Sequence, residues 1–172
     1  MTTRLQHLFD ILETDRRRLL EKIAMLTPDQ FTSAPPGKWS VSQILAHVLA
    51  AEKMSRAYME KKILGIQNAP NSTVVEEAKM LLLQFSQRVP FKFKAPAVVV
   101  KVTSAYQHPA DLISAWDEER SSLFIFLERI KTEELRRKIY KHVIMGKMNI
   151  QHALKFFREH FHHHLPQINH LL

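Results

Sequence analysis

The sequence contains no cysteine, has only three glycines among its 172 residues, and lacks any hydrophobic run long enough to cross a membrane. Without cysteine, neither a disulfide framework nor a thiolate metal site can form, so any thiol chemistry needs a thiol supplied by a small molecule. The scarcity of glycine excludes a glycine-rich phosphate loop. Polar residues interrupt residues 1–15, which therefore do not resemble a signal peptide. These absences predict a cytoplasmic protein without a membrane partner.

The composition is that of a globular domain, with 45% hydrophobic and 24% charged residues. The length suits a single domain, which we expect to span residues 1–172. Lysine and arginine exceed aspartate and glutamate by 25 to 17, giving a net charge of +8. The excess is spread along the chain, and its densest run, Arg16 to Arg18, has no interleaved aromatic residues. We therefore expect no specific nucleic-acid partner.

Hydrophobic residues recur at helical spacing over most of the chain. This pattern predicts four long helices, with a shorter helical segment over 72–89, and connecting segments at 27–38, 90–107 and 140–146. The long helices are expected at about 3–26, 40–64, 109–131 and 149–172. The predicted fold class is all-α: an up-down four-helix bundle with a longer connection and a short extra helical insertion.

Six of the ten histidines fall between residues 152 and 170. On a helix turning about 100° per residue, His160 and His164 share the apolar face. Two histidines at i and i+4 on one face can bind one divalent ion. The same geometry directs His152, His162 and His170 toward solvent. It places His163 at the edge of the apolar face, as a residue that supports a ligand or lies near the mouth of a site.

His47 is the best candidate for a third ligand because it interrupts the apolar stripe of the helix predicted over 40–64. Alone, such a histidine is more often a core residue bonded to a carbonyl group or a water molecule. Together with His160 and His164 on another core-facing helix, it favours a three-histidine metal site.

Two runs of residues resemble the signatures of the DinB/YfiT-like family of metalloenzymes. The first begins at Trp39 and ends at His47, and the second extends from His160 through His164 to Ile168. The resemblance implies a four-helix bundle in which His47, His160 and His164 bind a zinc, nickel or iron ion with one open position. Pro166 departs from the family pattern and is expected to kink the last helix.

Three neutral imidazoles leave a divalent ion with its positive charge and an open face. The sequence therefore predicts an enzyme that acts on a small-molecule substrate by activating water, as a hydrolase, or a low-molecular-weight thiol, as a thiol transferase. The alternative is a non-catalytic metal-binding or dimerising helical protein, and a homodimer is expected in either case. Gln43 and Gln167 are candidates for orienting the ligands or the substrate, with a helix-capping role as the alternative for Gln43, whereas Glu52 is expected to be solvated.

Overall fold

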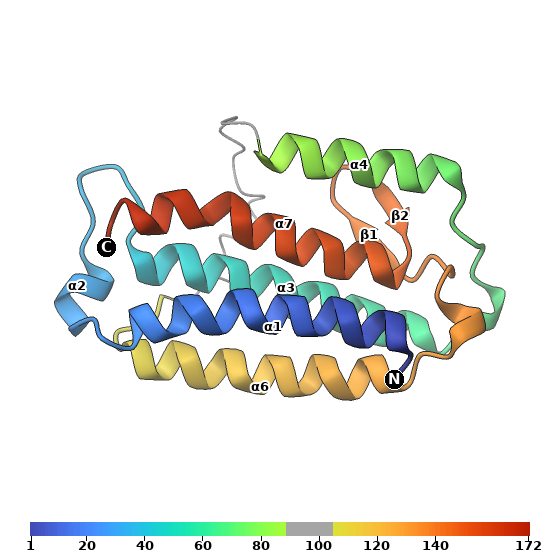
Figure 1. Ribbon diagram of the computed structural model, residues 1–172, viewed down its shortest axis with the longest axis horizontal. Helices are drawn as coiled ribbons and strands as arrows, with labels where there is room; N and C mark the ends of the chain where they lie inside the picture. The colour runs from blue at the N-terminus through green and yellow to red at the C-terminus, as the bar shows by residue number, and fades with distance from the viewer. Residues whose placement is uncertain (89–104) are drawn as a thin grey trace.

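The structure, a computed structural model, describes residues 1–88 and 105–172. Four long helices form its body, and they lie side by side (Figure 1). Helix α3 packs against α6 and α7, and α1 also packs against α6 and α7. The predicted all-α four-helix bundle is thereby confirmed. The four helices are α1 (Thr3–Ile23), α3 (Val41–Ile63), α6 (Pro109–Glu128) and α7 (Ile150–Asn169).

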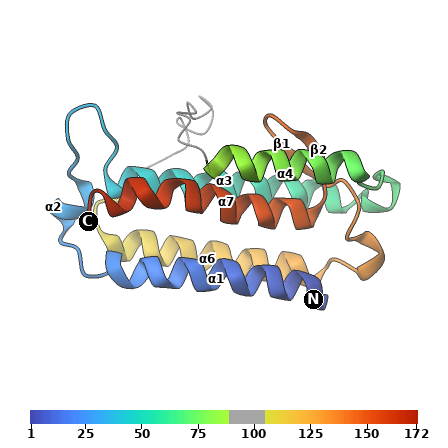
Figure 2. The same cartoon turned by 45° about the horizontal axis from the view of Figure 1, so that its top comes forward.

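The connection between α3 and α6 returns along the length of the bundle. As Figure 1 shows, α3 and α6 run in the same direction, whereas α1 and α7 run in the opposite one. The return path contains the short 3-10 helix η1 (Ile66–Asn68) and helix α4 (Val74–Arg88). Helix α4 packs on the outside of α7, as both views show (Figures 1 and 2). It is the extra helical segment that the sequence predicted.

The helix starts follow the capping residues in the sequence. Ser40 and Gln43 form a reciprocal capping box at α3, in which the Ser40 N–H donates to Gln43 Oε1 over 2.9 Å. At α7, the side chain of Asn149 accepts a hydrogen bond from the His152 N–H over 2.9 Å. Helix α7 continues through Pro166 to Asn169, so the proline lies inside the helix and does not end it.

Two connecting segments contain structure that the sequence analysis missed. Helix α2 (Pro28–Thr32) lies within the predicted loop 27–38, where Thr27 and Gln30 form a capping box. The predicted connector 140–146 contributes to an antiparallel hairpin of β1 (Tyr140–His142) and β2 (Gly146–Met148), preceded by the 3-10 helix η2 (Thr132–Glu134). Most of the loop predicted over 90–107 lies outside the described residues. None of the described helices is long and apolar enough to span a membrane.

A layer of buried charges divides the core into two hydrophobic clusters, which lie toward opposite ends of the bundle. Glu52 of α3 is 1% exposed and accepts hydrogen bonds from Trp116 Nε1 (2.9 Å) and Arg120 Nη2 (3.0 Å). Arg120 also forms an ion pair with Glu13 of α1 at 2.9 Å. The prediction that Glu52 is solvated was wrong, because its neighbours on α6 supply the partners that a buried carboxylate needs. This charged layer comprises Glu13, Arg16, Glu52, Glu119 and Arg120.

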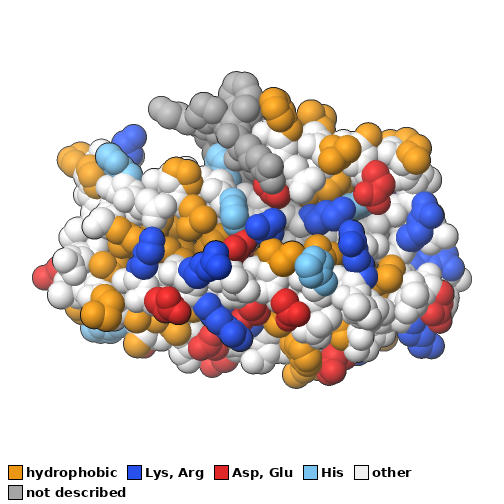
Figure 3. All heavy atoms as spheres, viewed as in Figure 1, with side chains coloured by type: hydrophobic (Ala, Val, Ile, Leu, Met, Phe, Trp, Pro, Cys, Tyr) orange, Lys and Arg blue, Asp and Glu red, His pale blue; other side chains and the backbone are white. Residues whose placement is uncertain are grey.

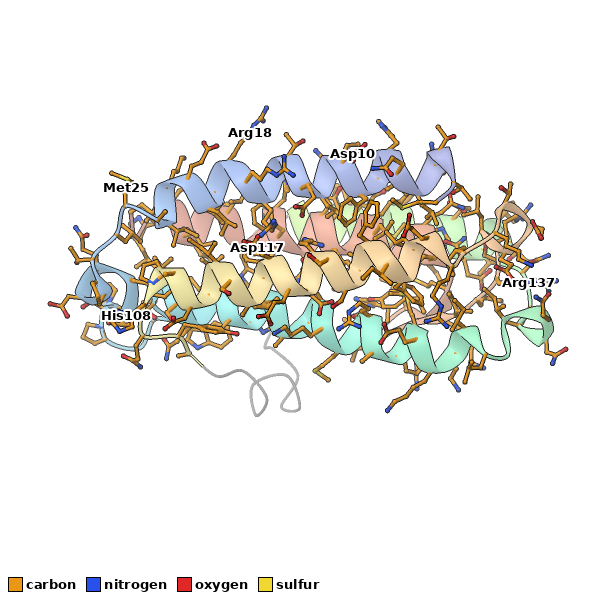
Figure 4. All side chains as sticks on the ribbon, turned by 90° about the horizontal axis from the view of Figure 1, so that it is seen from below. Asp10, Arg18, Met25, His108, Asp117 and Arg137 are labelled. Atoms are coloured by element: carbon orange, nitrogen blue, oxygen red, sulfur yellow. The ribbon has the colours of Figure 1, made fainter. Side chains whose placement is uncertain are left out.

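The charged layer continues to the surface between α1 and α6. Arg16 is buried and contacts Glu13 at 2.8 Å and Asp117 at 2.7 Å. Asp117 lies between the two helices, whereas Asp10 and Arg18 project from the outer side of α1 (Figure 4). The ion pairs therefore link α1, α3 and α6 at one level of the bundle.

We expect Glu52→Ala to lower the free energy of unfolding by about 3–5 kcal/mol, because it leaves Arg120 buried without one of its carboxylate partners. The measurement is urea unfolding followed by circular dichroism. Glu60→Ala is the matched control, since Glu60 lies on the same helix in a more exposed ion pair with Arg56, and the expected loss is below about 1 kcal/mol. Equal losses in the two variants would contradict the prediction.

Candidate metal centre

The packing of α3 against α7 brings His47, His160 and His164 together. Each can offer a ring nitrogen, and the three nitrogens all lie within 4.8 Å of one another. The ring centroid of His47 lies 5.1 Å from that of His160 and 5.2 Å from that of His164. Thus the structure groups the three residues that the sequence selected as candidate ligands.

The spacing within the α7 pair suits a tetrahedral ion. His160 Nε2 and His164 Nε2 are 3.3 Å apart. Two imidazole nitrogens bound to zinc at about 2.0–2.1 Å with tetrahedral angles are separated by about 3.3 Å. His47 is 4% exposed, and its Nδ1 atom is buried without a hydrogen-bond partner among the described residues. The donor set and the spacing of the α7 pair therefore fit a divalent metal ion.

Gln167 fixes the orientation of one imidazole. Its side-chain Oε1 lies 3.1 Å from His164 Nδ1, one helical turn along α7. An amide oxygen accepts, so His164 donates from Nδ1 and keeps the lone pair of Nε2 for the centre of the cluster. Gln43, the other residue considered for such a role, is engaged in the capping box of α3.

Aromatic rings pack against the imidazoles of His160 and His47 and limit their rotation. The Phe156 ring is stacked on His160, with centroids 5.3 Å apart and planes at 12°. The Trp39 ring meets His47 edge-on at 5.3 Å and is 39% exposed. The ring of His142 of β1 packs edge-on against Phe156, with centroids 4.6 Å apart. Neither Phe156 nor His142 was singled out from the sequence, although the alternation Tyr140, Lys141, His142 is typical of a strand.

The three candidate ligands are neutral at pH 7. Burial is the main cause that lowers the pKa of His47, with a smaller contribution from the charge of His163. Burial and neighbouring imidazoles hold the pKa of His160 well below 6.5. Burial lowers the pKa of His164 to about 4, which its hydrogen bond to Gln167 partly opposes. Neutral imidazoles are the form that binds metal ions, so the site is prepared for one.

The remaining histidines on α7 lie away from the three-histidine cluster or at its edge. His152 is fully buried, with its Nε2 atom 2.9 Å from Glu77 Oε1 of α4, so the prediction that it faces solvent was wrong. The cause is α4, which covers that side of α7. His162 is half-exposed, and its Nε2 atom lies 2.7 Å from Asp15 Oδ2 of α1. His170 is exposed, as predicted. The ring of half-buried His163 lies 5.1 Å from that of His164.

A sequence model of the DinB superfamily matches residues 11–168, a span that includes all three histidines. The chain belongs to the DinB superfamily. Because the match covers most of the chain, the superfamily assignment applies to the four-helix bundle as a whole.

Among solved structures, this DinB superfamily chain is similar to YfiT from Bacillus subtilis. The TM-score is 0.60 at 15% sequence identity, and the alignment covers 96% of this chain and 84% of YfiT. YfiT is described as a probable metal-dependent hydrolase with an unusual four-helix bundle topology. At this identity the similarity establishes the shared fold. No curated protein matches the sequence.

We expect the His164 imidazole to titrate at about pH 4 in the metal-free protein, as followed by nuclear magnetic resonance of its ring. The folded pKa is lower than the ordinary value of 6.5, so the unfolded chain takes up the proton first. The folded state therefore loses stability as the pH falls from 6.5 toward 4. A midpoint near 6.5 would show that the imidazole is not desolvated and would contradict this account of the site.

Proposed function

We propose that this protein is a metal-dependent enzyme in which His47, His160 and His164 bind a divalent ion, such as zinc, nickel or iron, and act on a small-molecule substrate. One observation carries the proposal: three neutral imidazoles from two helices converge within 4.8 Å, with two Nε2 atoms at the spacing of a tetrahedral pair. A four-coordinate ion held by three imidazoles has one position left for a reactant.

When bound there, the ion would supply positive charge that lowers the pKa of water or a thiol. The protein's own groups determine where that charge lies. Gln167 holds His164 in the tautomer that directs Nε2 toward the cluster, and Phe156 limits the rotation of His160. Burial of the imidazoles favours their unprotonated form, which is the form that binds a metal ion.

Two reaction types are compatible with this site. Hydrolysis is supported by the fold shared with YfiT, which is described as a probable metal-dependent hydrolase. Thiol transfer, with a low-molecular-weight thiol as cofactor, is compatible with the lack of cysteine, because the thiol would come from outside the chain. Both reactions use the same metal centre, so the binding of the metal is the first property to measure.

We expect about one equivalent of metal in the protein purified without a histidine tag, and a loss of binding in both His47→Ala and His160→Ala. Removing one ligand from a three-histidine site weakens binding strongly, because the remaining two imidazoles cannot complete the coordination. The measurement is elemental analysis after reloading with zinc. His170→Ala is the matched control because His170 is exposed near the end of α7, and it should retain the metal.

Folded wild-type protein that takes up neither zinc nor nickel would contradict the proposal. If the metal binds, hydrolytic and thiol-transfer substrates can be tested with the zinc-loaded protein, with His47→Ala as the inactive reference. A protein that needs the metal for stability but shows no turnover would instead favour the non-catalytic alternative.

A second candidate, a dimerising interaction protein, is favoured by the outer face of α4. This face is apolar and exposed, and hydrophobic side chains gather over α4 along the upper edge of the molecule (Figure 3). Contiguous apolar surface of this kind is typical of protein interfaces. The face consists of Val74, Val75, Leu81, Leu82 and Phe85, of which Leu82 is 59% exposed.

We expect the wild-type protein to sediment at twice its monomer mass of 20.1 kDa, and Leu82→Glu to sediment as the monomer. A buried carboxylate at the centre of an apolar interface has no partner, and its desolvation opposes association. Leu64→Glu is the control, since Leu64 is exposed at the end of α3, outside the apolar face of α4. A monomeric wild-type protein, or a dimer in both variants, would exclude the α4 face as the interface.

A further inference from the structure

The outer face of the β1–β2 hairpin has features that folding alone does not explain. On the inner face, Tyr140, His142 and Met148 are buried. On the outer face, Lys141 of β1 lies directly across from Lys147 of β2, and both are exposed. Like charges in directly opposed cross-strand positions destabilise a pair of strands. A repulsion of this kind in an otherwise consistent element indicates a role outside folding.

Neither lysine of the hairpin forms an ion pair within the part of the chain that the structure describes. The remaining segment, 89–104, contains no acidic residue, so it cannot provide a partner either. The whole connection between α6 and α7, residues 129–149, holds seven lysines and arginines but only two glutamates. The two lysines are therefore free to meet an external anionic group, in a stretch that is itself positively charged.

The tip of the hairpin is apolar and projects from the molecule. Val143 is 73% exposed and Ile144 is 69% exposed. In Figure 2 the loop between β1 and β2 rises past α4 at the edge of the molecule. Exposed apolar side chains that are adjacent, instead of scattered singly, are typical of an interaction site. The tip thus combines apolar side chains with the lysine pair directly behind them.

The loop is held in this shape by the residue beneath it. His142 Nδ1 accepts hydrogen bonds from the N–H groups of Ile144 (3.3 Å) and Met145 (3.2 Å). Gly146 has a φ of 77°, a left-handed conformation that glycine adopts without strain and that closes three-residue hairpin loops. The loop is therefore ordered before it meets a partner, which reduces the conformational entropy that binding costs.

An apolar tip backed by unpaired lysines matches the layers of an anionic membrane surface, whose charged head groups cover an apolar interior. We propose that the β1–β2 hairpin docks onto an anionic lipid surface. The side chains of Val143 and Ile144 enter the head-group region, and the two lysines contact its phosphate and carboxylate groups. The sequence predicted no membrane partner because it lacks a spanning segment, but surface contact does not need one. The inference is independent of the metal centre.

A lipid surface suits the hairpin better than another macromolecule does. A stable protein interface buries about 800 Å² on each partner, far more than two side chains at a loop tip can supply. Proteins that bind single-stranded nucleic acid stack its bases on aromatic rings, and the exposed residues of the hairpin include none. A fluid lipid surface, in contrast, can close around a small projecting loop.

The test measures cosedimentation of the full-length protein with lipid vesicles. We expect vesicles of phosphatidylcholine with about 30% phosphatidylserine to bind the protein at least about tenfold more tightly than vesicles of phosphatidylcholine alone. Added salt should weaken the binding, because it screens the attraction between the lysines and the head groups. A protein that binds neither kind of vesicle, or both equally, would overturn the proposal.

Two double substitutions separate the hairpin from the net charge of the chain. Lys141→Gln with Lys147→Gln should weaken binding at least about tenfold, without lowering the thermal stability, because the cross-strand repulsion is removed. Arg17→Gln with Arg18→Gln removes the same charge from exposed residues of α1, and the expected loss is below about twofold. Equal losses would show that only the net charge acts and would overturn the role of the hairpin.

A further pair of variants tests the apolar tip. Ile144→Ser should weaken binding to the anionic vesicles by about fivefold, because a polar side chain gains less on leaving water. Ile125→Ser is the matched control, since Ile125 lies on α6 and is 62% exposed, and it should bind as the wild type does. Unchanged binding in Ile144→Ser would overturn insertion of the tip. A loss confined to Leu82→Glu would assign the lipid contact to α4 and likewise overturn the proposal.

Discussion

The burial of Glu52 constrains how α3 packs against α1 and α6. A carboxylate that is 1% exposed is stable only where its partners reach it, and those partners lie on α6. Because Arg120 also contacts Glu13, sliding one helix along another would break ion pairs at the charged layer. The layer thus favours one register of α3 against α1 and α6, and with it one height for His47 in the bundle.

The candidate site depends on that register because its ligands come from two helices. His160 and His164 are neighbours on α7 under any packing, since i and i+4 residues share a helix face. His47 reaches them because α3 and α7 pack directly against each other. The rings of Phe156 and Trp39 then hold the imidazoles near their positions before any ligand arrives. A site that is already ordered loses less conformational entropy when it binds.

The sequence predicted what depends on local periodicity and missed what depends on distant contacts. The long helices and the three histidines follow from helical spacing, which the residues themselves reveal. Glu52 and His152 were assigned to solvent because a helical wheel shows only one helix, whereas the partners that bury them come from α6 and α4. The hairpin after Tyr140 was missed because three-residue strands give little alternation to detect.

The shared direction of α3 and α6 has a consequence for how such a protein can diversify. Two parallel neighbours cannot be joined by a tight turn, so the chain must travel back along the bundle between them, and α4 is part of that return. Neither His47 nor the α7 pair belongs to this segment. The exposed face of α4 can therefore vary, and with it the outer surface of the protein, while the inner face, where Met80 and Leu83 join the core, and the helices that carry the histidines keep their geometry.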